Sequence, residues 1–523
     1  MELSGERMAI KPMTFRMRLG RFFTGIPFIS WVLAVLAATG LEHYFGFALA
    51  ENILQLEDLP ALFGFIVLHR QPYLFPSALL YTLIIYIIPL IAVTKLTTPL
   101  FRNVTLRKTL AGIPLLAWLI GILVAVTLER LIGDFVAYDI LDLDKIPVLF
   151  GSLIIFKYPD LRFNAILYIV SIYLVPTIVI ARVIAGFANR IAESLLKLPI
   201  LIPVLIYLAL IYGILHYWSD VNAYRLLTVR LIMISIMLAL SLNVINGYMG
   251  EFSCSHPGFM ALGAYGASVV NLLFFTNDRI FGATIFPEYL AFFFFPVAII
   301  VGGLCASLGA LLIAIPSFRT RGDYLAIISL AFMFIVKSAI ENLEVVGGPR
   351  GLGGQPDLAT LPTVFIWCVL CIWIINNFVR SIIGKATNTV RDDEGAAESM
   401  TINTRRTKMT AFMFAAFWAG VAGGLFAHVL RYVNPGTFYF QRLAEILAMM
   451  YFGGLNSVYG SIMGAVSLSL LGEALRPLEI FKWIIIPLIL ILIMIFRPKG
   501  LISFKEFDVL HLIQPKSKPT EEI

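Results

Sequence analysis

The chain alternates between long apolar runs and short polar segments over its whole length. Runs of eighteen or more mostly apolar residues recur from end to end, and each is long enough to cross a bilayer as a helix. The strands of a membrane barrel would instead alternate apolar and polar residues over short segments. The pattern therefore predicts an all-α fold, a polytopic transmembrane helical bundle with about twelve crossings and a hairpin near residues 443–475.

The basic side chains indicate how the chain is threaded. With about twelve crossings and the hairpin, all clusters of Lys and Arg fall on one side of the membrane. They lie at 16–21, 95–108, 182–197, 319–321, 380–408 and 497–499. The acidic segments 51–60 and 138–147 then fall on the other side. Basic loops mark the cytoplasmic side of a membrane protein. We therefore expect a cytoplasmic leader at 1–24, a cytoplasmic tail at 503–523 and both termini in the cytoplasm.

Composition excludes a soluble chain and offers little redox or metal chemistry. Hydrophobic residues make up 59% of the 523 residues and charged residues 14%, with a mean hydropathy of +0.90. The net charge of +7 follows from the basic loops and does not point to nucleic acid. Cys254, Cys305, Cys368 and Cys371 lie in or beside apolar runs, which is typical of packed small residues. We expect this chain to bind no metal and no cofactor.

A tandem repeat occupies the first 200 residues. Residues 25–42, "GIPFISWVLAVLAATGLE", return as "GIPLLAWLIGILVAVTLE", and the segments at 59–64 and 80–91 return in the same way, each 87 residues later. The predicted copies are 25–111 and 112–198. Each copy holds two clear spans, so both have the same orientation, as in a parallel repeat. A duplicated hairpin explains this recurrence without any functional site.

Polar residues and glycines enter the spans after about residue 226. The stretch 242–270 contains five glycines, together with Glu251, Ser253, Ser255 and His256. A broken helix is tolerated at membrane depth only where protein or a watery cavity covers it, and polar groups at such breaks often line a substrate path. Tight packing through small residues explains the glycines equally well. Both interpretations of this stretch stay open.

The predicted hairpin offers a second candidate for the path. Glu445 stands near its start, and Gly453 and Gly454 allow the backbone to bend. An acid at this depth needs a partner or water. Arg442 is close enough in sequence to pair with it as a purely structural partner.

Five blocks of the second half carry a resemblance to a known family. They are "IPSFRTRGDYLAIISLAF" (315–332), "VVGGPRGLGGQP" (345–356), the long stretch 384–427 that begins "GKATNTVRDDEGAAESM", "YFGGLNSVYGSIMGA" (451–465) and "IFRPKGL" (495–501). In this order they resemble the permease subunits of branched-chain amino acid ABC importers, of the Liv M type. The resemblance covers roughly 226–502, and we assign a permease domain to 199–502. The N-terminal region 25–198 lies outside it.

The resemblance implies that the charged segment "RDDEGAAESMTIN" (391–403) couples the permease to an ATPase. The chain has no G-x-x-x-x-G-K-[ST] phosphate loop, so a partner must hydrolyse the ATP. Asp392 and Asp393 can cap a short helix here. The residues expected to meet the ATPase are Glu394, Ala396, Ala397, Glu398, Met400 and Ile402: the alanines permit close approach, the acids reach basic partners and the apolar pair packs. A solvated loop whose charges fix the topology is the alternative.

The resemblance further implies a transporter with no enzymatic activity of its own. The expected partners are ABC ATPase subunits, which bind ATP, a second related permease subunit and an extracytoplasmic substrate-binding protein. The expected location is the cytoplasmic (inner) membrane, with inward movement of branched-chain or similar amino acids. Three alternatives stay open: a urea or short-amide permease of the same family type, a self-sufficient secondary transporter or channel, and a membrane scaffold or regulator that acts through the N-terminal repeat.

Overall fold

The computed structural model describes residues 27–56, 72–101, 112–144, 146, 161–275, 282, 285–287, 290–318, 324–476, 482–496, 500, 502 and 507–515. Almost all of these residues are helical, which confirms the expected all-α helical bundle. The predicted leader at 1–24 and most of the tail at 503–523 lie outside them.

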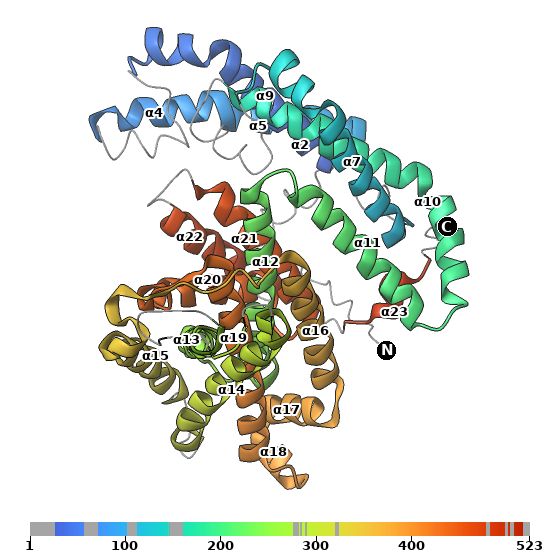
Figure 1. Ribbon diagram of the computed structural model, residues 1–523. Coiled ribbons are helices and arrows are strands. Elements are labelled where there is room, and N and C mark those ends of the chain that lie inside the picture. Colours follow the sequence, from blue (N-terminus) through green and yellow to red (C-terminus); the bar gives the residue numbers. More distant parts are fainter. Residues whose placement is uncertain are drawn as a thin grey trace, which may run out of the picture. The chain divides into compact units, whose positions relative to one another are not determined.

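The chain divides into two compact units, which are described separately (Figure 1). The N-terminal unit comprises Met1–Tyr207 with Ala474–Glu479 and Leu510–Ile523, and the C-terminal unit comprises Leu208–Glu473 and Ile480–Val509. Helix α11 (Leu201–Ser219) contributes residues to both units, and so does the short helix α23 (Val509–Ile513).

The N-terminal unit consists of helices interrupted by π-helical turns. Its α-helices are α2 (Phe28–Leu41), α4 (Phe75–Thr82), α5 (Ile88–Phe101), α7 (Leu115–Asp134), α9 (Arg162–Tyr168) and α10 (Val175–Leu196). Its π-helical turns are η1 (Glu42–Gly46), η2 (Leu49–Ile53), η4 (Leu83–Ile87), η5 (Phe135–Ile140) and η7 (Ile169–Leu174), and η3 (Pro72–Leu74) is a 3-10 turn. Helix α2 packs against α5, and α7 against α10.

Local backbone features recur within this unit at the spacing of the sequence repeat. Gln55 and Asp142 both have left-handed backbones, with φ of 53° and 49°. Helices α4 and α9 both lead into a π-helical turn, η4 and η7. These are similarities of short segments, and the tandem duplication and its boundaries stay a prediction.

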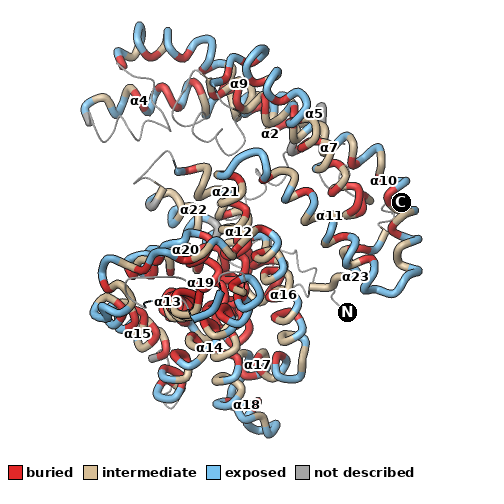
Figure 2. Tube along the Cα trace, viewed as in Figure 1, coloured by how far each residue is buried: buried red, intermediate tan, exposed pale blue. Residues whose placement is uncertain are grey.

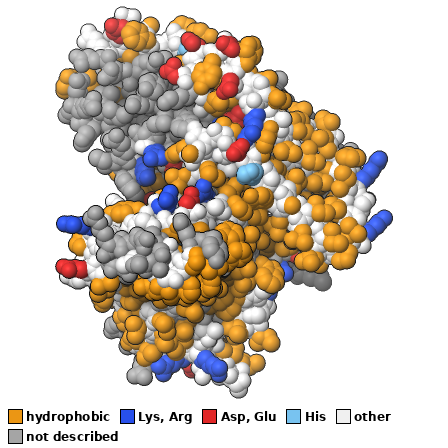
Figure 3. All heavy atoms as spheres, in the orientation of Figure 1, with side chains coloured by type: hydrophobic (Ala, Val, Ile, Leu, Met, Phe, Trp, Pro, Cys, Tyr) orange, Lys and Arg blue, Asp and Glu red, His pale blue; other side chains and the backbone are white. Residues whose placement is uncertain are grey.

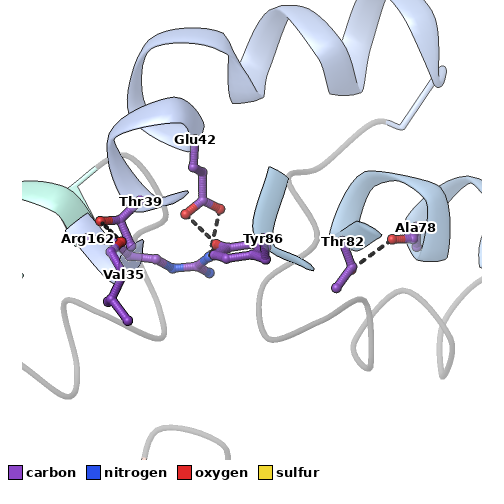
Figure 4. Close-up of polar contacts among 7 residues, drawn as sticks. All are labelled: Val35, Thr39, Glu42, Ala78, Thr82, Tyr86 and Arg162. Atoms are coloured by element: carbon purple, nitrogen blue, oxygen red, sulfur yellow. Dashed lines mark hydrogen bonds and ion pairs between the residues drawn. The ribbon is translucent and has the colours of Figure 1, made fainter. Parts of the chain in front are cut away.

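A buried polar cluster joins helices of the two predicted repeat copies (Figure 4). The Arg162 guanidinium donates to Glu42 Oε1 at 2.7 Å and to the Tyr86 hydroxyl oxygen at 2.5 Å. Tyr86 in turn donates to the second carboxylate oxygen of Glu42. The side chains of Arg162 and Glu42 are only 6% and 1% exposed. Two buried charges of opposite sign therefore neutralise each other in an apolar setting.

The C-terminal unit holds most of the remaining α-helices. They are α12 (Ala223–Asn243), α13 (His256–Phe275), α14 (Ala291–Ser317), α15 (Tyr324–Asn342), α16 (Leu361–Arg380), α17 (Ile382–Asp392), α18 (Glu394–Ser399), α19 (Thr404–Leu430), α20 (Phe440–Gly453), α21 (Val458–Ala474) and α22 (Lys482–Phe496). Shorter elements are η8 (Val244–Met249), η10 (Glu344–Val346), η11 (Gly348–Arg350), η12 (Pro435–Thr437) and the antiparallel strands β1 (Leu352–Gly353) and β2 (Tyr432–Val433).

The core of this unit lies where α13, α14 and α19 pack together, and Figure 2 shows buried residues concentrated along α12, α13 and α19. Glycines set the spacing of these helices. A Cβ at Gly263 would overlap the backbone of Gly420, and one at Gly423 would overlap the carbonyl oxygen of Met260. The glycines of this stretch thus allow helices to approach closely, as small residues do in membrane proteins.

The described helices include ten that are long and apolar enough to cross a membrane. Helix α22, which the sequence also counts as a crossing, has 15 residues, below the usual spanning length. Helix α2 has 14 residues and continues through η1 and η2 to Ile53. The predicted hairpin is formed by α20 and α21, with 14 and 17 residues. Figure 3 shows hydrophobic side chains over much of the visible face, as a bilayer requires.

The ion pair between Glu42 and Arg162 should be needed for the stability of the N-terminal unit. Replacing Arg162→Met leaves a buried carboxylate unpaired, which should cost about 3 kcal/mol and lower the Tm measured in mild detergent. The double variant Glu42→Gln with Arg162→Met should recover part of the loss. Arg190→Met, which alters an exposed arginine of α10, is the matched control. Equal Tm values for Arg162→Met and this control would contradict a stabilising pair.

Candidate functional site

The predicted coupling segment folds as a short helix, α18, between two longer ones. The carboxylate of Asp393 accepts a hydrogen bond from the backbone N–H of Ala396 at 3.0 Å, so Asp393 caps the helix. Asp392, the other expected cap, pairs with the preceding Arg391 at 2.7 Å instead. One acid of the expected pair therefore fixes where α18 begins, and the other holds an arginine.

Helix α18 has a buried side and an exposed side. Ala397 is completely buried, whereas Ala396 is exposed and Met400 is 74% exposed. Ile402 is half-buried, and its N–H donates to the carbonyl of Ala397 at 3.1 Å. We expected both alanines to allow close approach of a partner. In the structure Ala397 faces the interior of its own unit and only Ala396 is exposed. The contact with a partner stays a prediction.

Lys408, in the second turn of α19, joins the two predicted sites. Its ammonium donates to Glu251 Oε1 at 2.8 Å and to Glu394 Oε2 at 2.9 Å. Glu251 was expected on a translocation path and Glu394 on the coupling helix, yet both bind one cation. The second acid of α18, Glu398, accepts from Thr404 Oγ1 at 3.0 Å. Helix α18 is thus held by two carboxylates, each bonded to a side chain of α19.

Helix α17 adds another contact with the break between α12 and α13. Helix α12 ends in the π-helical turn η8, and Gly250 follows with a left-handed φ of 78°. Arg391, the penultimate residue of α17, lies over Gly250, and its Nη1 donates to the carbonyl of Gly247 at 3.4 Å. A side chain at position 250 would collide with Arg391. The break therefore contacts residues on both sides of the coupling helix.

The polar residues of the break are buried and bonded inside the unit. Ser253, Ser255 and His256 are all 0% exposed. The hydroxyls of Ser253 and Ser255 lie 2.8 Å apart, and His256 Nε2 lies 3.2 Å from Ser241 Oγ on α12. In this structure the three residues hold the segment between α12 and α13 in place. Their part in a translocation path stays a prediction.

Further bonds hold the same segment against neighbouring helices. The N–H of Cys254 donates to Ser329 Oγ of α15 at 2.9 Å, and the N–H of Ser253 donates to Asn246 Oδ1 at 3.2 Å. Burial raises the pKa of the Cys254 thiol, so the thiol stays protonated. The expected role of this cysteine as a packed small residue suits these surroundings.

The turn between α20 and α21 is fastened to α12 by one asparagine. Asn243 Nδ2 donates to the carbonyl of Ser457 at 3.1 Å and to Ser461 Oγ at 2.7 Å, and Asn243 Oδ1 accepts from the N–H of Asn456. Gly453 lies so close to α21 that a Cβ would overlap the carbonyl of Gly460. Gly454 has a φ of 123°, which only glycine adopts readily.

Glu445 lies in the first half of α20 and pairs with Arg442 at 2.9 Å, the structural partner that the sequence offers. Both residues line a cavity of about 130 Å³ in the C-terminal unit. Gly453 and Gly454 stand two turns or more further along the helix and do not line that cavity. Glu445 and the two glycines, which the sequence offers as one candidate site, therefore lie at separate places.

Sequence reasoning missed Lys408 as a contact residue and treated it as a topology charge. A usable signal existed, because a charged residue in the early turns of a spanning helix requires a partner. Asn243 carried the same signal, as an amide near the end of an apolar helix. Neither signal identifies the residue that makes the contact, since Lys408 and Glu251 are 157 residues apart in the sequence.

This architecture defines a multi-pass membrane protein with a short capped helix exposed between two of its long helices. The chain belongs to the family described as the branched-chain amino acid transport system permease component, whose profile matches residues 224–496. The match covers nearly the same region as the resemblance seen in the sequence, and the resemblance is confirmed.

Two curated relatives carry the name high-affinity branched-chain amino acid transport system permease protein LivM. The protein of Escherichia coli (strain K12) is 30% identical over 311 residues, which cover 52% of this chain and 68% of the relative. The protein of Salmonella typhimurium (strain LT2) is 30% identical over 309 residues with the same coverage. No solved structure matches the chain.

Removal of the Lys408 ammonium should loosen both α18 and the break. In Lys408→Met, hydrogen exchange of the backbone at 394–399 and 250–255 should be roughly tenfold faster, because a charge-assisted bond contributes about 1.5 kcal/mol. The bond to Glu251 should dominate, since Glu394 is half-exposed and more screened. Arg405→Met, on the exposed side of the same helix, is the control. Exchange rates equal to those of the control would rule out the link.

Proposed function

We propose that this chain is the permease subunit of an ATP-driven ABC importer that moves branched-chain or similar amino acids into the cell. The observation that carries the proposal is α18, a capped helix with an exposed outer face inside the region that matches the permease family. The names of the two relatives support the substrate class. The chain supplies a pathway and no covalent chemistry.

The coupling helix would receive force from an ATPase on the cytoplasmic side of the inner membrane. Ala396 and Met400 offer a small and an apolar contact on the exposed face of α18. ATP would be bound and hydrolysed entirely by the partner subunits. Because basic loops mark the cytoplasmic side, both termini would lie in the cytoplasm, together with α17 and α18.

Movement of α18 would reach the membrane interior through its bonds to α19 and the break. Glu394 and Glu251 share the ammonium of Lys408, so a displacement of the coupling helix pulls on the segment between α12 and α13. That segment is non-helical from Gly250 to Ser255, and such segments can absorb large changes in backbone angles. The switch between outward and inward access would begin there.

The complete importer would contain three further kinds of subunit. A second related permease would complete the pathway, two ATPases would close beneath the pair, and a substrate-binding protein would deliver the amino acid from outside. The loop around β1 and β2, which joins 352–353 to 432–433, lies at the ends of helices away from α18 and is the proposed contact for that delivery.

An acid on the outer face of α18 should uncouple transport. Met400→Asp places a charge where an apolar contact with the ATPase is proposed, so the ATPase recovered with the tagged permease from gentle detergent should fall at least tenfold. ATP-dependent leucine uptake should fall with it, while the amount of permease in the membrane stays unchanged. Pull-down with mass spectrometry and uptake into vesicles measure the two effects.

Thr389→Asp adds the same charge to an exposed position of α17 and should leave ATPase recovery and uptake close to wild type. If Met400→Asp behaves like this control, α18 is not the coupling helix. If the wild-type chain is recovered alone and moves solute without ATP, the importer proposal itself fails and a secondary transporter takes its place.

A further inference from the structure

The cavity beside Glu445 has the size and the chemistry of a site for a small molecule. It is lined by helices α12, α19, α20, α21 and α22 within the C-terminal unit, and its volume is about 130 Å³. One ordered water needs roughly a tenth of that space. The cavity is therefore large enough for a ligand of several heavy atoms.

Four charged side chains line this cavity, two of each sign. Arg442 and Glu445 come from α20, Glu473 from α21 and Lys482 from α22. Arg442 Nη1 lies 2.9 Å from Glu445 Oε2, and Glu473 accepts a hydrogen bond from the hydroxyl of Tyr224. A lining that carries both signs and no net charge suits a zwitterion better than a simple cation or anion.

Two buried donors in the same lining have no protein acceptor among the described residues. They are the Nε–H of Arg442 and the hydroxyl of Ser469. A buried donor without a partner costs free energy, so each is a place for a ligand atom that accepts hydrogen bonds. A carboxylate is such a group, and the positive charge of Arg442 favours it.

The rest of the lining is mainly apolar, apart from the hydroxyls of Thr228 and Ser235 on α12. Leu231 and Ile232 of α12, Leu468 of α21 and Ile486 of α22 supply aliphatic surface. A few convergent polar groups in a mainly apolar pocket are typical of small-molecule sites. Together the donors, the two carboxylates and the aliphatic wall fit a carboxylate, an ammonium and a short apolar side chain.

We infer that this cavity is a transit site for a neutral amino acid with an apolar side chain. The inference rests on the proposed function and adds a location to it. The α-carboxylate is held by Arg442 and Ser469, the α-ammonium by Glu445 or Glu473, and the side chain by the aliphatic wall. The site is distinct from the break at Gly250–Ser255 that the sequence singled out.

Helix α20 connects this site to the coupling helix. Arg442 and Glu445 stand in its first two turns, and the turn after Gly453 is fastened to α12 by Asn243. Asn243 lies one π-helical turn before the break that Lys408 ties to α18. A change at the break can thus reach the cavity through α12 and α20, which both contribute to its lining.

The glycine at position 472 allows a direct test. Gly472 lines the cavity, and a Cβ built there meets no atom within 4 Å. The substitution Gly472→Leu therefore fills the space without a clash in the helix packing. Gly213 of α11 is equally open and does not line the cavity, so Gly213→Leu is the matched control for stability and assembly.

Binding is measured on the purified full-length chain by saturation-transfer NMR with leucine as the probe, which detects weak ligands. Wild type and Gly213→Leu should transfer saturation to the leucine methyl groups, and Gly472→Leu should reduce the signal at least tenfold. Isovalerate and isobutylamine, which keep one charge each, should compete less well than isoleucine. Equal signals from Gly472→Leu and Gly213→Leu would overturn the site.

Uptake separates this inference from the proposed function. With partners present, Gly472→Leu should lose at least tenfold in leucine uptake while ATPase subunits are still recovered. Gly472→Ala should lose more leucine uptake than alanine uptake, a change in selectivity that a packing defect would not cause. Normal ATP-driven uptake by Gly472→Leu overturns the site and leaves the importer standing. Suppose instead that the wild-type chain binds leucine, that Gly472→Leu abolishes this binding, and that no ATP-driven uptake is found. The binding site then stands, and the importer proposal fails.

Discussion

One ammonium group holds together the part of the structure on which the proposed mechanism depends. Lys408 binds a carboxylate 157 residues before it, at a break between membrane helices, and another 14 residues before it, on the exposed helix α18. The Lys408 side chain is only 12% exposed, so its ammonium is largely shielded from water. A charge so placed needs its partners, and these partners couple α18 to the break.

Much of the fold follows from hydropathy. Apolar runs of spanning length predict the helices, because the backbone in a bilayer has no other way to satisfy its hydrogen bonds within one segment. The short helix α18 was also predictable, since an acidic cap followed by small residues at 393–397 stands out in an apolar chain. The buried side of α18 could not be predicted, because the helix has only six residues and too few turns to show a periodic pattern.

The contacts between distant residues could not be predicted from the sequence. Ser255 and His256 in sequence suit a watery path as well as a buried network, and only the fold places Ser241 beside His256. The π-helical turns have no residue signature, yet η8 sets where the break begins. The cavity is formed from five helices, so no single segment of the sequence carries its pattern of charges.

In the N-terminal unit, too, buried charged side chains are paired, but by different residues. Glu42 and Arg162 are buried together with Tyr86, and the family match begins only at residue 224. The ion pair fixes the packing of the predicted repeat copies, and nothing in it resembles the cavity or the coupling helix. This unit therefore carries a stabilised helical structure outside the residues that the family profile matches.

The most direct test of the account is to find what touches the exposed face of α18 in the native membrane. A photo-crosslinking amino acid at position 400, in a chain that still transports, should give one major adduct after illumination. The account predicts that mass spectrometry identifies the partner as a protein with a G-x-x-x-x-G-K-[ST] phosphate loop. A transporting chain whose position 400 gives adducts only with lipid or with itself would contradict the coupling role of α18.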